Sequence, residues 1–287
     1  MAKEANPGKL TPSTIRIGNR YRANRLQGPY DAVVIGSGIG GLTTAACLSK
    51  AGQKVLVLEQ HYTAGGYTHS YARNGYEWDV GVHYIGDMGA RHTLGRRLFD
   101  YITDGKLEWA PMAENYDRFF LGDKVVNLQA GKEGLRHSLL AAFPGEKAAI
   151  DRYMTLLGKV ANGMQWYTLS KLSPALASPL VSKGLKSVLP DCFNRTTYDV
   201  LSELTDNQEL IGAITGQWGD CGVTPKQSSF MVHALIARHY QYGGFYPVGG
   251  ASEIAKSIIP VIQAGGGDVH TYADVKEILI EKGKAVG

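Results

Sequence analysis

The chain contains 287 residues, carries a formal net charge of +4 and has a sequence pI near 8.8. That length is enough for a large hydrophobic core and for two interleaved domains. The basic excess is not clustered with interleaved aromatic residues, so the sequence indicates no nucleic-acid partner. The cysteines are odd in number, far apart and form no C-x-x-C pair, which argues against disulfide-relay chemistry and for a reducing compartment: Cys47, Cys192 and Cys221.

Residues 1–29 are predicted to form a flexible basic leader. Six basic residues stand against Glu4 in this stretch, which also contains proline and glycine. Contact of the leader with anionic lipid is the alternative interpretation. The sequence has neither the apolar core of a secretory signal nor a run of ~18 apolar residues that would span a bilayer. We therefore expect a cytoplasmic protein, with peripheral contact to the cytoplasmic face of a membrane as the alternative.

The first predicted element is a buried parallel strand at residues 31–35, because its apolar run is continuous, short and rich in β-branched residues. Glycines with the spacing G-x-G-x-x-G follow it, and a helix rich in small residues is predicted after them. A second strand at residues 55–58 ends immediately before Glu59. Strand, glycine loop, helix, strand and acid occur in the order that predicts a dinucleotide-binding site.

Each residue type in this motif has a specific role. Gly36 permits the tight turn, and Gly38 lacks a Cβ, so a diphosphate can approach the backbone at the positive end of the helix. Gly41 allows the helix to pack closely on the strand, and Glu59 is placed to accept hydrogen bonds from the adenosine ribose. The predicted cofactor-binding residues of this region are Gly36, Gly38, Gly40, Gly41, Glu59, Gly65 and Gly66.

The second glycine pair, Gly65-Gly66, follows Glu59 after five residues, and Asp79-x-Gly81 follows the pair. A nicotinamide-dependent dehydrogenase does not need this second pair. A flavin enzyme does, because the longer cofactor passes its diphosphate and ribityl chain along a second backbone segment at close approach. The spacing therefore favours FAD, and it resembles the flavoprotein group that includes amine oxidases and phytoene desaturases.

Three blocks follow the leader: residues 30–90 as the first segment of the FAD-binding domain, residues 91–242 as a substrate or cap region, and residues 243–287 as the return to an incomplete FAD-binding domain. The expected fold class is α/β, a doubly wound Rossmann-type FAD-binding domain with an inserted, mainly helical substrate or cap domain. Helices are predicted at residues 146–160, 198–204, 209–214 and 252–264, and a strand at residues 275–280.

Residues 172–189 alternate apolar residues with lysine and proline. The plainer interpretation is an amphipathic cap helix packed against the core. The alternative is a segment that enters a membrane interface.

The motifs narrow the resemblance further. They are similar to the retinol saturase and carotenoid isomerase branch of the flavoprotein group, within the FAD-dependent phytoene desaturase, carotenoid isomerase and all-trans-retinol 13,14-reductase family. The segments that carry the similarity are residues 30–42, 55–61, 64–66, 79–86 and 243–250. The resemblance implies an FAD-dependent oxidoreductase that saturates, desaturates or isomerises carbon–carbon double bonds of an apolar, isoprenoid-like small molecule. Its electron donor or acceptor stays unknown.

The resemblance also implies further site residues. Val275 would lie on the strand whose backbone pairs with the adenine edge, and an interior structural valine is the alternative. His83 and Tyr84, in the flavin-proximal signature, are the candidate catalytic residues, because the reaction moves one proton and a histidine titrates near cellular pH. A neutral structural histidine is the alternative for His83.

Two further alternatives concern the whole chain. Tyr67 follows the glycine pair where amine oxidases usually carry arginine, which disfavours a flavin amine-oxidase-like enzyme. Members of the family end in another glycine-containing segment that closes over the flavin, and the sequence up to Gly287 lacks it, so a catalytically incomplete nucleotide-binding fragment is the other alternative. No metal site is predicted, because no H-E-x-x-H motif, zinc-spaced Cys/His set or Walker loop is present.

Overall fold

The computed structural model describes residues 15–82, 84–131, 133–172 and 191–287. The chain forms two compact units, Met1–Ala110 with Phe245–Gly287, and Pro111–Gly244. We call the first the Rossmann-like unit and the second the inserted unit. Except for Leu172, the stretch for which a cap helix or membrane contact is predicted lies outside the described residues.

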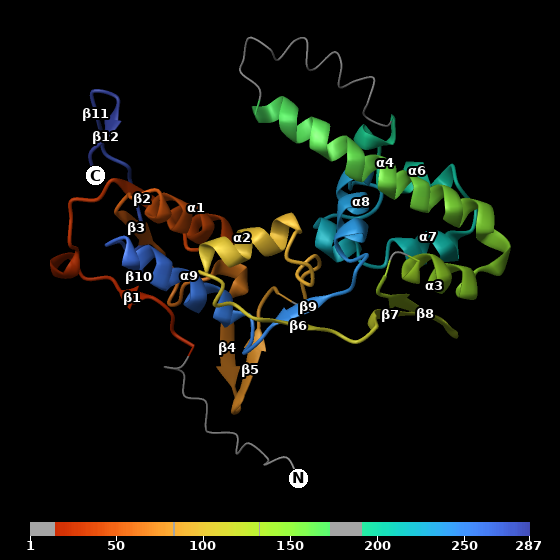
Figure 1. Ribbon diagram of the computed structural model, residues 1–287, viewed down its shortest axis with the longest axis horizontal. Helices are drawn as coiled ribbons and strands as arrows, with labels where there is room; N and C mark the ends of the chain where they lie inside the picture. The colour runs from red at the N-terminus through yellow and green to blue at the C-terminus, as the bar shows by residue number, and fades with distance from the viewer. Residues whose placement is uncertain (1–14, 83, 132, 173–190) are drawn as a thin grey trace. The chain divides into compact units, whose positions relative to one another are not determined.

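A four-stranded parallel sheet forms the centre of the Rossmann-like unit, in the order β1-β10-β3-β2 (Figure 1). Its strands are β1 (Asn19–Arg20), β10 (Asp268–Thr271), β3 (Val55–Leu58) and β2 (Ala32–Ile35). The two apolar runs on either side of the glycine loop are thus neighbours in one parallel sheet, with Ala32 opposite Val55 and Ile35 opposite Leu58. The predicted α/β class with a Rossmann-like sheet is confirmed.

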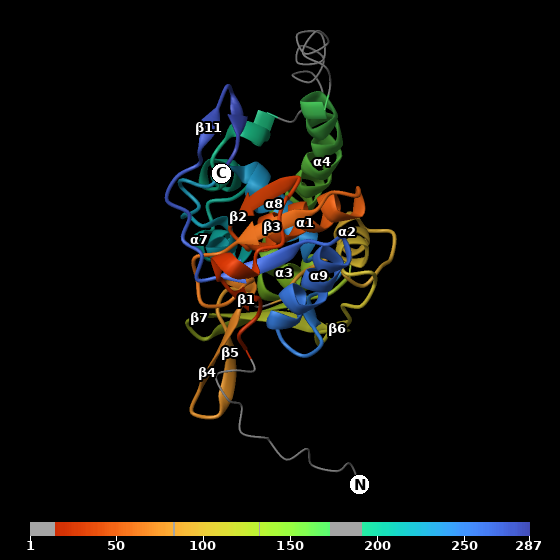
Figure 2. The same cartoon turned by 90° about the vertical axis from the view of Figure 1, so that its left-hand side faces the viewer.

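Two helices pack on this sheet and against each other (Figure 2). They are α1 (Ile39–Lys50), which connects β2 to β3, and α9 (Ser252–Ala264), which precedes β10. Small buried residues allow the close approach: Ala45 and Ala46 on α1, and Ala255 on α9. Larger apolar side chains of α1, α9, β3 and β10 complete this core: Leu42, Val55, Val57, Ile254, Ile258, Ile262 and Val269.

Two-stranded sheets and connecting segments complete the Rossmann-like unit. The β4–β5 hairpin projects away from the parallel sheet in both Figure 1 and Figure 2. Ile102 and Leu107 enter the core, so the first segment of this unit continues to Ala110. The elements are β4 (Ser70–Arg73), β5 (Tyr76–Asp79), α2 (Leu94–Ile102), β6 (Trp109–Pro111), β9 (Phe245–Pro247), β11 (Ile280–Glu281) and β12 (Lys284–Ala285).

The inserted unit combines an antiparallel hairpin with helices, and its longest helix, α4, packs against α3 and α8 (Figure 1). Its elements are β7 (Asn115–Leu121), β8 (Lys124–Gln129), α3 (Gly134–Ala142), α4 (Lys147–Leu172), α6 (Thr197–Ser202), α7 (Gln208–Ile214) and α8 (Phe230–His239). The helices predicted in this region are confirmed, although α4 continues beyond residue 160. The hairpin was not predicted.

Two predictions about local structure are wrong. The leader is not flexible from Ile15 onward, because Ile15 and Ile17 are buried and β1 pairs with β10 at the edge of the sheet. Residues 275–279 do not form a strand. β10 already occupies the place beside β3, because residues 268–271 follow the glycine turn at the end of α9 directly and Val269, His270 and Thr271 are buried there.

Candidate dinucleotide-binding site

The glycine loop forms the turn between β2 and α1. Gly36 has a φ of +95°, a backbone conformation that side chains with a Cβ rarely adopt. A Cβ on Gly41 would lie 2.0 Å from the carbonyl oxygen of Gly36. Glycine at these two positions therefore lets the helix begin directly against the strand.

Gly38 and Gly40 face open space at the start of α1. A Cβ at either position would meet no protein atom within 4 Å. Gly38 is the N-cap residue and provides no side-chain hydrogen bond to the first turn, so the N–H groups of that turn lack intrahelical acceptors. Unpaired N–H groups at the positive end of a helix are the backbone feature that binds phosphates.

The second glycine pair lies directly against this loop. Gly65 and Gly38 form an isolated parallel bridge, and the Gly65 N–H donates to the carbonyl of Ser37 at 3.1 Å. A Cβ on Gly66 would lie 2.7 Å from the Cα of Gly38. The structure thus brings together two glycine segments that the sequence separates by more than twenty residues, and their backbones lie directly against each other.

Glu59 follows β3 and is 8% exposed. Its Oε2 accepts hydrogen bonds from Ser37 N at 2.8 Å and Ser37 Oγ at 2.7 Å, and its Oε1 accepts one from His61 N at 2.8 Å. Burial raises the pKa of Glu59, but the hydrogen bonds from His61 and Ser37 together outweigh it, so the pKa is lower than usual. A carboxylate has roughly four acceptor positions, so Oε1 keeps an acceptor position beside the hydrogen bond from His61 N.

Ser37 is a site residue that the sequence reasoning missed. It is fully buried, and its Oγ accepts a hydrogen bond from Gly65 N at 3.2 Å while it donates to Glu59. One hydroxyl therefore links Glu59 to the second glycine pair. The G-x-G spacing leaves this position unspecified, and the only signal was a polar residue in a turn expected to be buried.

Asp79, at the end of β5, is hydrogen-bonded to residues 245–251, the return segment that follows the inserted unit. Its Oδ2 accepts a hydrogen bond from the Tyr246 hydroxyl, and its Oδ1 accepts from Ser70 Oγ at 2.8 Å and Ala251 N at 3.2 Å. Burial and the hydrogen bond to Asp79 raise the pKa of Tyr246 to about 12. The Asp79-x-Gly81 signature is therefore a structural joint, and Gly81 N also donates to the Tyr67 carbonyl at 3.1 Å.

The remaining predicted site residues are His83, Tyr84 and Val275. His83 lies outside the described residues. Tyr84 is half-buried and precedes Ile85, which exchanges two 2.8 Å backbone hydrogen bonds with Phe245. Val275 lies in irregular chain two residues beyond Ala273, whose N–H donates to the Glu59 carbonyl at 2.8 Å.

The described residues contain neither a metal-binding cluster nor a helix able to span a membrane. In that part of the chain, no group of three or more His, Cys, Asp or Glu side chains is arranged to hold a metal ion. None of the helices described there combines the length and apolar character that crossing a membrane requires.

Comparison with known proteins shows what this chain is similar to. A family model described as an NAD(P)-binding Rossmann-like domain matches residues 34–102. Over 276 residues the chain is 42% identical to all-trans-retinol 13,14-reductase of Homo sapiens, an alignment that covers 93% of this chain and 45% of the human protein. The chain is a homologue of the all-trans-retinol 13,14-reductases. The resemblance drawn from its motifs is confirmed.

More distant relatives and a solved structure show further similarities. Chloroplastic prolycopene isomerase of Daucus carota is 30% identical over 272 residues, which cover 90% of this chain and 43% of that protein. The chain spans less than half the length of these relatives. The solved structure of an oxidoreductase from Methanosarcina mazei matches with a TM-score of 0.59 and 21% identity, over 89% of this chain and 54% of that one. At that identity the structural likeness shows the fold alone.

Proposed function

We propose that this chain binds FAD through the Rossmann-like unit and serves redox chemistry at carbon–carbon double bonds of an apolar, isoprenoid-like molecule. The observation that carries the cofactor proposal is the pairing of Gly38 with Gly65 beside the buried carboxylate of Glu59. The substrate class rests on the names of the homologues, a retinol reductase and a prolycopene isomerase.

The residues fit FAD on three counts. The positions of Gly38 and Gly40 are open where a diphosphate would approach. Gly65 and Gly66 extend the same backbone surface, which suits a cofactor longer than a single nucleotide. Glu59 supplies an acceptor for the ribose. When bound, FAD supplies hydride or electron transfer, and the protein supplies binding, orientation and proton handling.

We assign the N–H groups of the first turn of α1 to the diphosphate and Glu59 to the adenosine ribose. The backbone near Val275 would contact the adenine edge, because this segment follows the residue that donates to the Glu59 carbonyl. His83 and Tyr84 would hold the proton that accompanies double-bond chemistry. These two residues precede Ile85, the residue that pairs with the return segment.

Cofactor binding can be tested with the purified chain. Calorimetric titrations with FAD, and separately with NADPH, are expected to give saturable binding of FAD and much weaker binding of NADPH. The bound flavin should be visible in the absorbance spectrum after gel filtration. Tighter binding of NADPH than of FAD would contradict a flavin site.

The substrate class needs a separate measurement. After anaerobic reduction of the bound flavin with dithionite, addition of all-trans-retinol should reoxidise the flavin. The polyene absorbance band should move to shorter wavelength as one conjugated double bond is lost. Reoxidation without loss of polyene absorbance would contradict the proposal. Putrescine added to the oxidised protein tests the amine-oxidase alternative, for which we expect no flavin reduction.

A further inference from the structure

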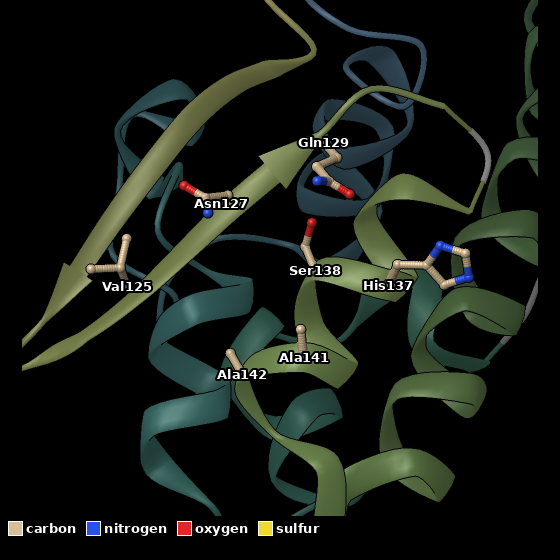
Figure 3. A pocket seen from close by; sticks show the side chains of 7 residues that line it. All are labelled: Val125, Asn127, Gln129, His137, Ser138, Ala141 and Ala142. Atoms are coloured by element: carbon tan, nitrogen blue, oxygen red, sulfur yellow. The ribbon is translucent and has the colours of Figure 1, made fainter.

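A groove of about 290 Å³ lies in the inserted unit between β8 and α3, and we call it the β8–α3 groove (Figure 3). Three alternate residues of β8, which share one face of the strand, face four residues of α3. The lining residues are Val125, Asn127, Gln129, His137, Ser138, Ala141 and Ala142. Its volume is close to the lower end of roughly 300–1,000 Å³ that is usual for small-molecule pockets.

Ser138 provides the first indication of a ligand. The residue is 8% exposed, and its hydroxyl oxygen is buried without a hydrogen-bond partner. Figure 3 shows this oxygen directed from α3 toward Gln129 on β8. Buried polar groups in folded proteins are almost always hydrogen-bonded, so an unpartnered hydroxyl beside a groove indicates a bond that a bound molecule would complete.

The neighbouring amides define the chemistry of this end of the groove. Asn127 Oδ1 accepts a hydrogen bond from Arg118 Nε at 2.7 Å, which leaves the Asn127 amide N–H groups available. The Gln129 side chain makes no hydrogen bond to the described residues, and none of the described lining residues is Asp, Glu, Lys or Arg. The one titratable residue among the described lining residues, His137, turns its ring away from Ser138 in Figure 3. The amide and hydroxyl groups at this end both donate and accept, which suits a neutral hydroxyl.

The opposite end of the groove is apolar. Val125, Ala141 and Ala142 lie away from Gln129 in Figure 3 and present methyl groups alone. An occupant that satisfies both ends therefore carries a hydroxyl at one end and a hydrocarbon at the other, because burying the hydrocarbon is favourable where the lining is apolar.

We propose that the β8–α3 groove binds the hydroxyl end of an isoprenoid alcohol. The hydroxyl and the hydrocarbon follow from the lining of the groove, whereas the choice of an isoprenoid rests on the proposed function. Geraniol, a short isoprenoid alcohol, is a suitable probe because it carries a terminal hydroxyl on a branched chain.

Calorimetric titration of the purified chain with geraniol tests the proposal. We expect saturable binding that Ser138→Ala weakens about fivefold, the effect of one lost neutral hydrogen bond. Ser202→Ala is the matched control, because the Ser202 hydroxyl on α6 is also buried without a partner but does not line the groove. Ala141→Leu fills the groove from an exposed helix position and should abolish binding.

Absence of saturable binding, or equal affinities of the parent, Ser138→Ala and Ala141→Leu proteins, would overturn the proposal. Equal affinity for 1-octanol and geraniol would overturn the isoprenoid assignment. FAD binding without geraniol binding would overturn the proposal for the groove and leave the FAD proposal unaffected. Geraniol binding with the Ser138 effect, in a chain that does not bind FAD, would support the groove and contradict the proposed function.

Discussion

At Ser37 a single hydroxyl donates to Glu59 and accepts from Gly65, so it acts as a positioning group for both parts of the proposed FAD site. Replacement by alanine keeps the backbone N–H bond to Glu59 and removes the two side-chain bonds. The carboxylate and the second glycine pair then lose their common partner. We expect the loss of FAD affinity to exceed the loss of folding stability, because the backbone contacts remain.

We expect Ser37→Ala to weaken FAD binding about tenfold, roughly 1.5 kcal/mol for a lost hydrogen bond to a charged group. Because this bond helps to lower the pKa of Glu59, the variant should also lose affinity at a higher pH than the parent as the solution is acidified. Ser49→Ala is the control, since Ser49 is buried on α1 with only a 3.5 Å contact to the Ile262 carbonyl. Identical FAD affinities and pH profiles in both variants would contradict the role of Ser37.

Gly38 offers a test in which folding and binding separate. A Cβ there meets no atom within 4 Å beyond its chain neighbours and the backbone has a φ of −60°, so the folded chain has room where a side chain would begin. In the FAD complex the same side chain would occupy the space of the diphosphate. We expect Gly38→Val to abolish measurable FAD binding and to leave the thermal unfolding midpoint close to that of the parent. Gly158→Val, at another position without close neighbours, should keep its FAD affinity.

At the scale of elements, the joint between β5 and β9 holds the return segment in place. Tyr246 is the middle residue of β9, and its hydroxyl donates a hydrogen bond to Asp79 at the end of β5. Tyr246→Phe removes this bond and leaves the ring. We expect the free energy of unfolding to fall by about 1.5 to 3 kcal/mol, the range for a hydrogen bond to a charged group.

Urea unfolding would measure this loss, with Tyr242→Phe as the control because Tyr242 is 52% exposed. A loss of similar size in both variants would show that the Asp79 joint contributes nothing specific.

Local patterns predicted some elements and missed others for physical reasons. The strand at residues 55–58 and the helix at residues 252–264 have the bounds that the sequence predicted, because each is an uninterrupted apolar or amphipathic run. The β4–β5 hairpin was missed although its turn is Asn74-Gly75, where both residues have positive φ, 54° and 82°. That dipeptide is a strong hairpin signal. The prediction for residues 30–90 is only that they form the first segment of the FAD-binding domain, so it contains no hairpin.

At the scale of the whole molecule, buried His233 makes stability depend on pH. It lies in the inserted unit, is 6% exposed, and its Nε2 is 3.0 Å from the Tyr153 hydroxyl. Burial lowers its pKa from 6.5 to about 4. Between these values the unfolded chain binds a proton that the folded chain does not, so stability that is fully present above pH 6.5 is lost as the pH falls toward 4. The loss is about 3 kcal/mol at most.

Urea unfolding at several pH values should show this loss in the parent. His233→Gln should lower stability at pH 7 but flatten the decline between pH 6.5 and 4, because glutamine does not titrate. His92→Gln, at an exposed position, is the control and should keep the parent's slope. A His233→Gln protein with the parent's slope would contradict the assignment.

The glycine loop of the Rossmann-like unit can be predicted from local sequence, because strand, glycine turn, helix and acid are adjacent along the chain and each residue acts through local geometry. Tertiary structure decided what depends on distant contacts. It placed Gly65 against Gly38, made Ser37 a link between them and Glu59, and paired residues 19–20 with β10. It also removed the strand expected near Val275, since hydrogen-bond partners in a sheet are assigned by which segments meet in space.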